Sequence, residues 1–174
     1  NVTSYGTYIK TLTLSGGTVT GTGGTASSSS YGVRIDSIAT ISNEAKLVGT
    51  GGISERHSSY GISGDTISVS GSATVTGTGG QAAEGSRGIY VGEALNMSEG
   101  SSAKVTGIGG NGDSSIGLYI SSDSSSLSGG TLTVEGDSIG SHEVVIAKFV
   151  APYTVEAAAN DVIIDYRNTE VPTD

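Results

Sequence analysis

The sequence lacks cysteine, and this absence excludes both disulfide bonds and thiolate metal sites. Long hydrophobic runs are also missing, because stretches such as 144–147 are far shorter than the roughly 20 residues of a membrane-spanning helix. Basic residues are few: 8 Lys and Arg stand against 17 Asp and Glu, which gives a net charge of -9. We therefore expect no membrane span, and no nucleic acid or anionic membrane as a direct partner.

Glycine, in contrast, is abundant, with 29 residues, and it is arranged in a repeat. A segment that ends in a Gly-Gly pair recurs at 19–24, 47–52, 75–80 and 105–110. A second marker, a glycine followed by an extended apolar segment, recurs in step at Gly6, Gly32, Gly61, Gly88 and Gly117. Two markers that share one period of about 28 residues indicate stacked structural repeats.

Within each repeat, apolar and small polar residues alternate with a period of two, which is typical of strands with one buried face. The third repeat predicts three short strands, around Ile62, at 67–69 and at 73–76, separated by Gly, Ser and Asp. Alignment of the repeats predicts an inward column of Val19, Leu47, Val75, Val105 and Leu132. The fold class is therefore all-β. We expect a right-handed, single-stranded parallel β-helix (β-solenoid) of about five coils of ~28 residues.

A change in composition divides this domain into regular coils over 1–140 and a C-terminal segment over 141–174. The C-terminal segment holds the only Phe and both prolines of the chain. We expect it to form an irregular cap, because the uncovered end of a solenoid would aggregate. The alternative is an assembly segment through which molecules self-associate, and the solenoid ends offer a second route to such association.

A column of polar residues follows the first strand of each coil. Its acidic members are Asp36, Asp65, Glu93 and Asp123. Carboxylates one coil apart are candidate Ca²⁺ ligands together with turn carbonyls, since this cation takes oxygen ligands. The alternative, favoured by the imperfect register of the last two acids, is that each carboxylate hydrogen-bonds the backbone of its own turn.

Aromatic and basic residues line the outward side of the first strand. The candidate ligand-binding residues in this column are Tyr8, Arg34, Tyr90 and Tyr119. Exposed aromatic rings suit stacking against sugar rings, and arginine binds carboxylates or hydroxyls. The alternative is a structural ladder of tyrosines that stabilises the sheet. A second column, expected to be structural and to fill a corner, consists of Tyr5, Tyr31 and Tyr60.

The loops after the Gly-Gly pairs differ most between repeats, and such loops often carry binding surfaces. Their charged residues and histidine are Glu55, Arg56, His57, Glu84, Arg87 and Asp113. These residues form either a recognition edge or solvated loop tips. Only His57 and His142 offer a base that works near neutral pH, and the sequence gives neither a fixed partner. We therefore expect no enzymatic activity.

Paired threonines raise one further alternative, a flat ice-binding face. Thr18 and Thr20 form such a pair in the first coil, and Thr74 with Thr76 forms another. An ice-binding face would need one column filled with threonine throughout. The column is interrupted by Lys46 and Lys104, so the sequence does not favour this function.

The recurring Tyr-Gly-Ile/Val, Ser-Gly-Gly-Thr and Gly-Thr-Gly-Gly segments resemble those of extracellular bacterial parallel β-helix proteins. They look most like the carbohydrate-binding β-helix proteins of clostridia, relatives of the pectate-lyase solenoid, over residues 4 to about 136. The resemblance implies binding of acidic polysaccharide with calcium held by turn carboxylates. The positions that match are Asp36, Asp65, Glu93 and Asp123. The sequence shows no clustered Arg and Asp set of the kind that lyases use.

The expected function is that of a non-catalytic module, secreted or displayed on the surface of a bacterium. It would act in adhesion or as a structural segment of a larger surface protein. The alternative is a calcium-assisted module that binds acidic glycans such as polygalacturonate. The expected partner is accordingly a polysaccharide or a glycan of a host or cell surface, and Ca²⁺ is the one cofactor that the sequence indicates.

Overall fold

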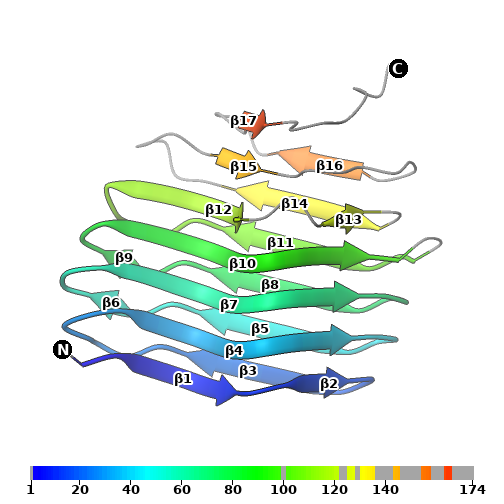
Figure 1. The fold of residues 1–174 in the computed structure, drawn as a ribbon, viewed down its shortest axis with the longest axis horizontal. Helices are drawn as coiled ribbons and strands as arrows, with labels where there is room; N and C mark the ends of the chain where they lie inside the picture. Colours follow the sequence, from blue (N-terminus) through cyan, green and yellow to red (C-terminus); the bar gives the residue numbers. More distant parts are fainter. Residues whose placement is uncertain are drawn as a thin grey trace.

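The computed structural model describes residues 2–98, 101–121, 125–127, 130–135, 143–145, 154–157 and 163–165. These residues form a parallel β-solenoid of about four turns with a repeat of ~28 residues, and they contain no helix (Figure 1). A fifth coil begins at Ser114 and is described in part. Because no helix is present, the described chain has none that could cross a membrane.

Two parallel sheets form the walls of the solenoid. The first follows the order β1 (Ser4–Ile9), β4 (Ser30–Ile41), β7 (Ser58–Val69), β10 (Gly85–Met97) and β12 (Ser114–Ile120). Two short strands, β2 (Leu12–Leu14) and β13 (Ser126–Leu127), pair with β4 and β10. The second sheet follows the order β3 (Thr18–Thr22), β5 (Lys46–Thr50), β8 (Thr74–Thr78), β11 (Lys104–Ile108), β14 (Thr131–Glu135) and β16 (Thr154–Ala157).

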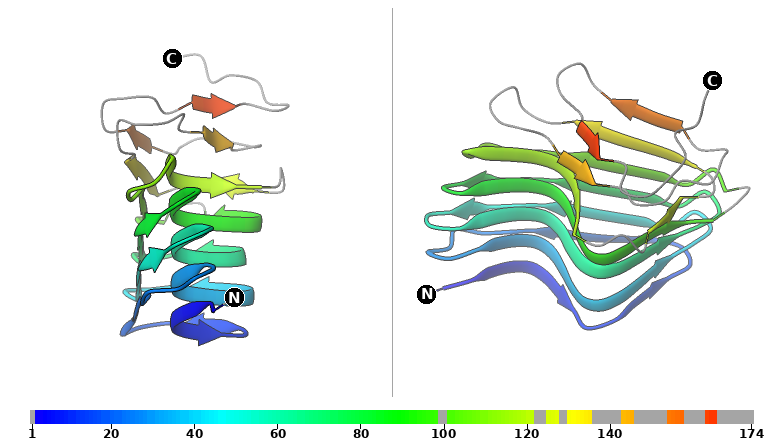
Figure 2. Two further views of the ribbon diagram at one scale, coloured as in Figure 1. Left: turned by 90° about the vertical axis from the view of Figure 1, so that its left-hand side faces the viewer. Right: turned by 45° about the horizontal axis from the view of Figure 1, so that its top comes forward.

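The sequence predicts three short strands per coil, but in the inner coils the first two form one long strand that bends (Figure 2). At the bend two residues of one strand oppose one residue of the next, so that Asp36 and Ser37 of β4 lie opposite Asp65 of β7. This arrangement is a β-bulge, which bends a strand without ending its pairing. Polar residues suit a bulge as well as a turn, and the sequence pattern does not distinguish the two.

The predicted apolar columns are confirmed. Leu47 of β5 pairs with Val75 of β8, which pairs with Val105 of β11, and all three side chains are completely buried. The same holds on the first sheet, where Ile62 of β7 lies between Val33 and Ile89 in the neighbouring coils. Full burial of an aliphatic side chain stabilises the fold by roughly 1.5–3 kcal/mol, so these columns carry most of the stability.

The repeated glycines are explained by a close approach of the two sheets at one side of the tube. A Cβ atom added to Gly77 of β8 would lie 2.5 Å from Cγ1 of Ile89 and 2.8 Å from the carbonyl carbon of Gly88. The marker glycine Gly32 is equally tight, because its added Cβ atom would lie 2.6 Å from the carbonyl oxygen of Thr50. Only glycine permits such an approach of two backbones.

A ladder of buried serines closes this narrow side. Ser59 donates its hydroxyl to the carbonyl of Gly52 at 2.8 Å and accepts the N–H of Gly80 at 3.2 Å. Ser30 and Ser86 make the same two bonds in the coils on either side. Each serine therefore links the Gly-Gly pair before it to the pair one coil further along, and it provides hydrogen-bond partners for backbone groups of both pairs in part-buried positions.

The C-terminal segment is described at three short strands. β16 pairs with β14, so the second sheet continues into this segment. β15 (Glu143–Val145) pairs with β17 (Ile163–Asp165) in a separate two-stranded sheet. The prediction of a cap or an assembly segment over 141–174 otherwise falls on residues outside the described part.

Candidate functional site

The marker glycine places two columns of polar and aromatic side chains on one outer face of the first sheet. On β4, Gly32 and Val33 are both buried, although they are consecutive in the chain. This interruption of the alternation puts Tyr31 and Arg34, three residues apart, on the same outer side. Strict alternation counted back from Val33 would instead place Tyr31 on the inward side. The expectation that the column of Tyr5, Tyr31 and Tyr60 is structural is confirmed by the stacking of its rings, which lie on this outer side.

We call this outer surface the tyrosine–arginine face. Its residues are Tyr5, Tyr8, Tyr31, Arg34, Tyr60, Arg87, Tyr90 and Tyr119. The register of the candidate column Tyr8, Arg34, Tyr90 and Tyr119 is as predicted. Tyr5 and Tyr8, in the first coil, are 46% and 55% exposed, whereas the other four tyrosines of the face are half-buried.

The tyrosine rings stack along the axis of the solenoid. Tyr31 and Tyr60 lie 4.8 Å apart at an interplanar angle of 6°, and Tyr90 and Tyr119 lie 5.6 Å apart at 7°. An edge-on contact at 5.8 Å between Tyr60 and Tyr90 joins these two stacks. Such geometries contribute about 0.5–1.5 kcal/mol per pair. The ladder is therefore present, and because neighbouring rings cover one another's faces, the inner tyrosines offer edges and hydroxyls to a ligand.

Arg34 is neutralised by an acid of its own strand. Its Nε lies 3.2 Å from Oδ1 of Asp36, and its Nη1 donates to the hydroxyl of Ser63 at 2.7 Å. The hydroxyl of Tyr8 donates to the other oxygen of Asp36. This hydrogen bond lowers the pKa of Asp36, and the Arg34 guanidinium lowers it further. The same hydrogen bond raises the pKa of Tyr8, and Arg34 opposes that shift. Two predicted ligand-binding residues are thus already engaged with a predicted calcium ligand.

Arg87 stands in different surroundings. Its guanidinium carbon lies 5.5, 5.9 and 5.2 Å from the ring centres of Tyr60, Tyr90 and Tyr119. Its Nη1 donates to the Tyr60 hydroxyl at 3.1 Å and to the Ser58 hydroxyl at 3.2 Å, and both acceptors are neutral. No described carboxylate forms an ion pair with it. Sequence reasoning places this residue in a loop, as part of a recognition edge or as a solvated tip, although its position one repeat after Tyr60 is a signal that places it on the face.

The acidic column does not gather into a metal site. Asp36 is held by Tyr8 and Arg34, and Oε2 of Glu93 accepts a hydrogen bond from the hydroxyl of Thr66 at 3.3 Å. In the described ranges no three His, Asp or Glu side chains come together as metal ligands. A calcium site built from single carboxylates and turn carbonyls stays a prediction, and Asp123 lies outside the described residues.

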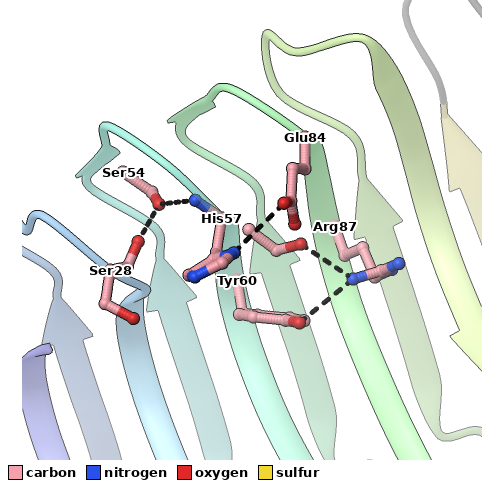
Figure 3. A network of polar contacts seen from close by, with 7 residues as sticks. Ser28, Ser54, His57, Tyr60, Glu84 and Arg87 are labelled. Carbon is pink, nitrogen blue, oxygen red and sulfur yellow. Dashed lines mark hydrogen bonds and ion pairs between the residues drawn. The ribbon is translucent and has the colours of Figure 1, made fainter. Parts of the chain in front are cut away.

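The loops after the Gly-Gly pairs contact the corresponding loops of the neighbouring coils (Figure 3). Strands β6 (Ile53–Ser54) and β9 (Gln81–Ala82) pair with each other in parallel and form a small third ladder. Nδ1 of His57 lies 3.1 Å from Oε1 of Glu84 in the next loop, so His57 has a fixed partner that the sequence does not reveal. The buried hydroxyl of Ser54 donates to the backbone carbonyl of Ser28, which makes it a structural group and not a nucleophile poised by the imidazole.

Comparison of the chain with models of protein families, with curated proteins and with solved structures found no match. The parallel β-solenoid is established by the strand pairing itself. The resemblance to clostridial carbohydrate-binding β-helix proteins stays a prediction.

Proposed function

We propose that the chain is a non-catalytic adhesion module of a secreted or surface-displayed bacterial protein, and that the tyrosine–arginine face contacts glycans of the opposing surface. The observation that carries this proposal is the continuity of the face. Its aromatic rings connect every coil from Tyr5 to Tyr119, and its two arginines lie between them. Residues with an apolar body and a polar tip are those that contact sugars best.

The stacking of the rings also supports a purely structural role, which is the second candidate. Stacked tyrosines hold neighbouring coils in register, and a segment of this kind serves as a stiff spacer in a larger surface protein. The two candidates differ in one respect: adhesion requires that the half-exposed edges and hydroxyls bind a ligand, whereas a spacer requires only that the stack is intact.

The test measures retention of beads that carry the full chain on surfaces coated with neutral or acidic glycans. The double variant Tyr5→Ser/Tyr8→Ser removes the most exposed part of the face. The matched control, Thr20→Ala/Thr22→Ala, changes exposed side chains of β3 on the second sheet. We expect retention of the wild type, a several-fold loss in the tyrosine variant and no change in the control, with melting temperatures recorded for all three proteins.

Equal retention of the two double variants would refute adhesion through this face. If the wild type binds no glycan surface, the spacer role replaces adhesion. Shortening of the glycan during the assay would refute the non-catalytic assignment. The same assay run with and without Ca²⁺ tests the calcium-assisted alternative, because retention that disappears on chelation would favour that alternative.

A further inference from the structure

We propose that Arg87 is a binding site for a single carboxylate carried by an otherwise neutral glycan. This inference rests on the proposed function, since it names the chemical group that the tyrosine–arginine face recognises. It starts from a contrast between the two arginines of the face: Arg34 contacts one ring and an acid, whereas Arg87 contacts three rings and only neutral hydrogen-bond partners.

Arg34 has its charge balanced within the protein, because Asp36 lies against its guanidinium at 3.2 Å. Arg87 is packed among three rings and bonded only to neutral hydroxyls. A guanidinium remains charged at all accessible pH values. The described part of the face therefore contains one positive charge with a counter-ion and one without.

The hydrogen bonds of Arg87 leave defined donors for an outside acceptor. Nη1 uses its hydrogens on the hydroxyls of Tyr60 and Ser58, and Nε is buried without a partner. Nη2 is thus the group whose hydrogens can meet a ligand, and in Figure 3 the dashed contacts of Arg87 all lie on one side of its guanidinium. Because the Tyr60 oxygen accepts from Nη1, the Tyr60 O–H can itself donate outward. A carboxylate with two oxygens suits these two neighbouring donors.

The surrounding rings hold the guanidinium in place before a ligand binds. An arginine fixed by cation–π contacts and hydrogen bonds loses little rotamer entropy on binding, so more of the interaction energy appears as affinity. This arrangement is more favourable for recognition than a flexible surface lysine or arginine.

The charge of the rest of the molecule limits how acidic the ligand can be. The chain has a net charge of -9, and Asp36, Asp65 and Glu93 all belong to the sheet that carries the face. A polymer with a carboxylate on every unit would be repelled along most of its length. A neutral chain with an isolated carboxylate avoids this repulsion and still provides hydroxyls for the tyrosine rim.

A glycan fits this face better than a peptide does. Peptides are commonly recognised by addition to a free sheet edge or by side-chain pockets. The inner strands β4, β7 and β10 are paired on both sides, so the face around Arg87 has no free edge. What it provides is a row of ring edges and hydroxyls, which matches the hydroxyl groups of sugars.

The experiment measures the dissociation constant for a xylose oligosaccharide bearing one glucuronate and for its carboxyl-reduced form. We expect the wild type to bind the acidic form about tenfold more tightly, as one charge-assisted hydrogen-bonded contact provides. Arg87→Gln should bind both forms equally. The control Lys46→Gln, which removes one positive charge from an exposed position of the second sheet, should keep the tenfold preference. Polygalacturonate should bind the wild type more weakly than the singly charged oligosaccharide.

Each other outcome overturns a defined part of the proposal. Equal binding of the two oligosaccharides by the wild type refutes the carboxylate site and leaves the proposed function intact, whereas binding of neither form counts against the proposed function as well. Persistence of the preference in Arg87→Gln refutes the assignment to this residue. Equal affinity for a Gly-Ser peptide with one Glu refutes the assignment to glycans. The comparison on wild-type protein needs no variant, so it can refute the carboxylate site even if Arg87→Gln does not fold.

Discussion

The close approach of the two sheets predicts that one glycine-to-alanine substitution disrupts the solenoid while another, in the same coil, is tolerated. In Gly77→Ala the new methyl group would lie 2.5 Å from Cγ1 of Ile89 and 2.8 Å from the carbonyl carbon of Gly88. Both are well inside van der Waals contact, and the carbonyl belongs to a strand that is paired on both sides. The sheets must therefore move apart to accept the methyl group.

Gly64 provides the matched control. A methyl group at this position would meet Cγ1 of Ile67 at 3.5 Å and Cβ of Ile35 at 3.6 Å, which are ordinary contacts. Gly64 is buried and occupies an apolar column between Ile35 and Val91. The alanine also reduces the conformational freedom of the unfolded chain, so we expect Gly64→Ala to stabilise the protein by about 0.5 kcal/mol.

Overpacking of a tight core typically costs 1–3 kcal/mol, and a backbone obstacle puts Gly77→Ala at the upper end, about 3 kcal/mol. For a chain of this size, this cost lowers the melting temperature by roughly 6–12 °C, whereas Gly64→Ala raises it by 1–2 °C. Thermal and urea unfolding followed by the β-sheet circular dichroism signal measures both changes. Two variants with equal melting temperatures, or a greater loss in Gly64→Ala, would refute the argument from sheet contact.

Three further predictions concern the serine ladder, the apolar columns and the hydrogen bond between Tyr8 and Asp36. Ser59→Ala removes two part-buried hydrogen bonds, including the one from the N–H of Gly80, and at about 0.5–1.5 kcal/mol per bond it should cost about 1–3 kcal/mol in urea unfolding. Leu47→Ala, in a completely buried column, should cost about 2–5 kcal/mol in the same assay. In an ultraviolet titration Asp36→Asn should return the raised pKa of Tyr8 toward 10.0. Since a raised pKa contributes stability that is lost as pH rises through the folded value, the variant should also reduce the loss of stability above pH 10.

The fold was predictable because its main signal is repeated. A single strand with alternating residues is ambiguous, but Leu47, Val75 and Val105 occupy the same place in three successive repeats and pair as expected. Repetition also fixes the register, since a slip of one residue would turn every buried column outward. The bend in the long strands was not predictable in the same way, because Asp36 and Asp65 are compatible with a turn and with a bulge.

The position of the tyrosine column depends on information that one coil does not contain. Gly32 faces inward because the backbone of β5 lies against it, and this contact produces two consecutive inward residues. Alternation counted along the sequence therefore places Tyr31 on the wrong side. The serine ladder could not be predicted for a related reason. Ser59 is one serine among many in the chain, and it is distinguished only by its hydrogen bonds to the Gly-Gly pairs of two neighbouring coils.

The candidate site shows why net charge is a poor guide to the partners of this protein. A charge of -9 argues against anionic partners when it is treated as a property of the whole molecule. At physiological ionic strength, however, charges are screened beyond about 8 Å, so a bound group responds mainly to its nearest neighbours. Arg34 contributes little to that local field because Asp36 cancels it, whereas Arg87 has only neutral partners in the described residues. The two arginines differ because an acid, Asp36, stands two residues after Arg34, whereas no described acid is bonded to Arg87. The uncompensated charge of Arg87 allows an acidic protein to bind an isolated anion at one point of its surface.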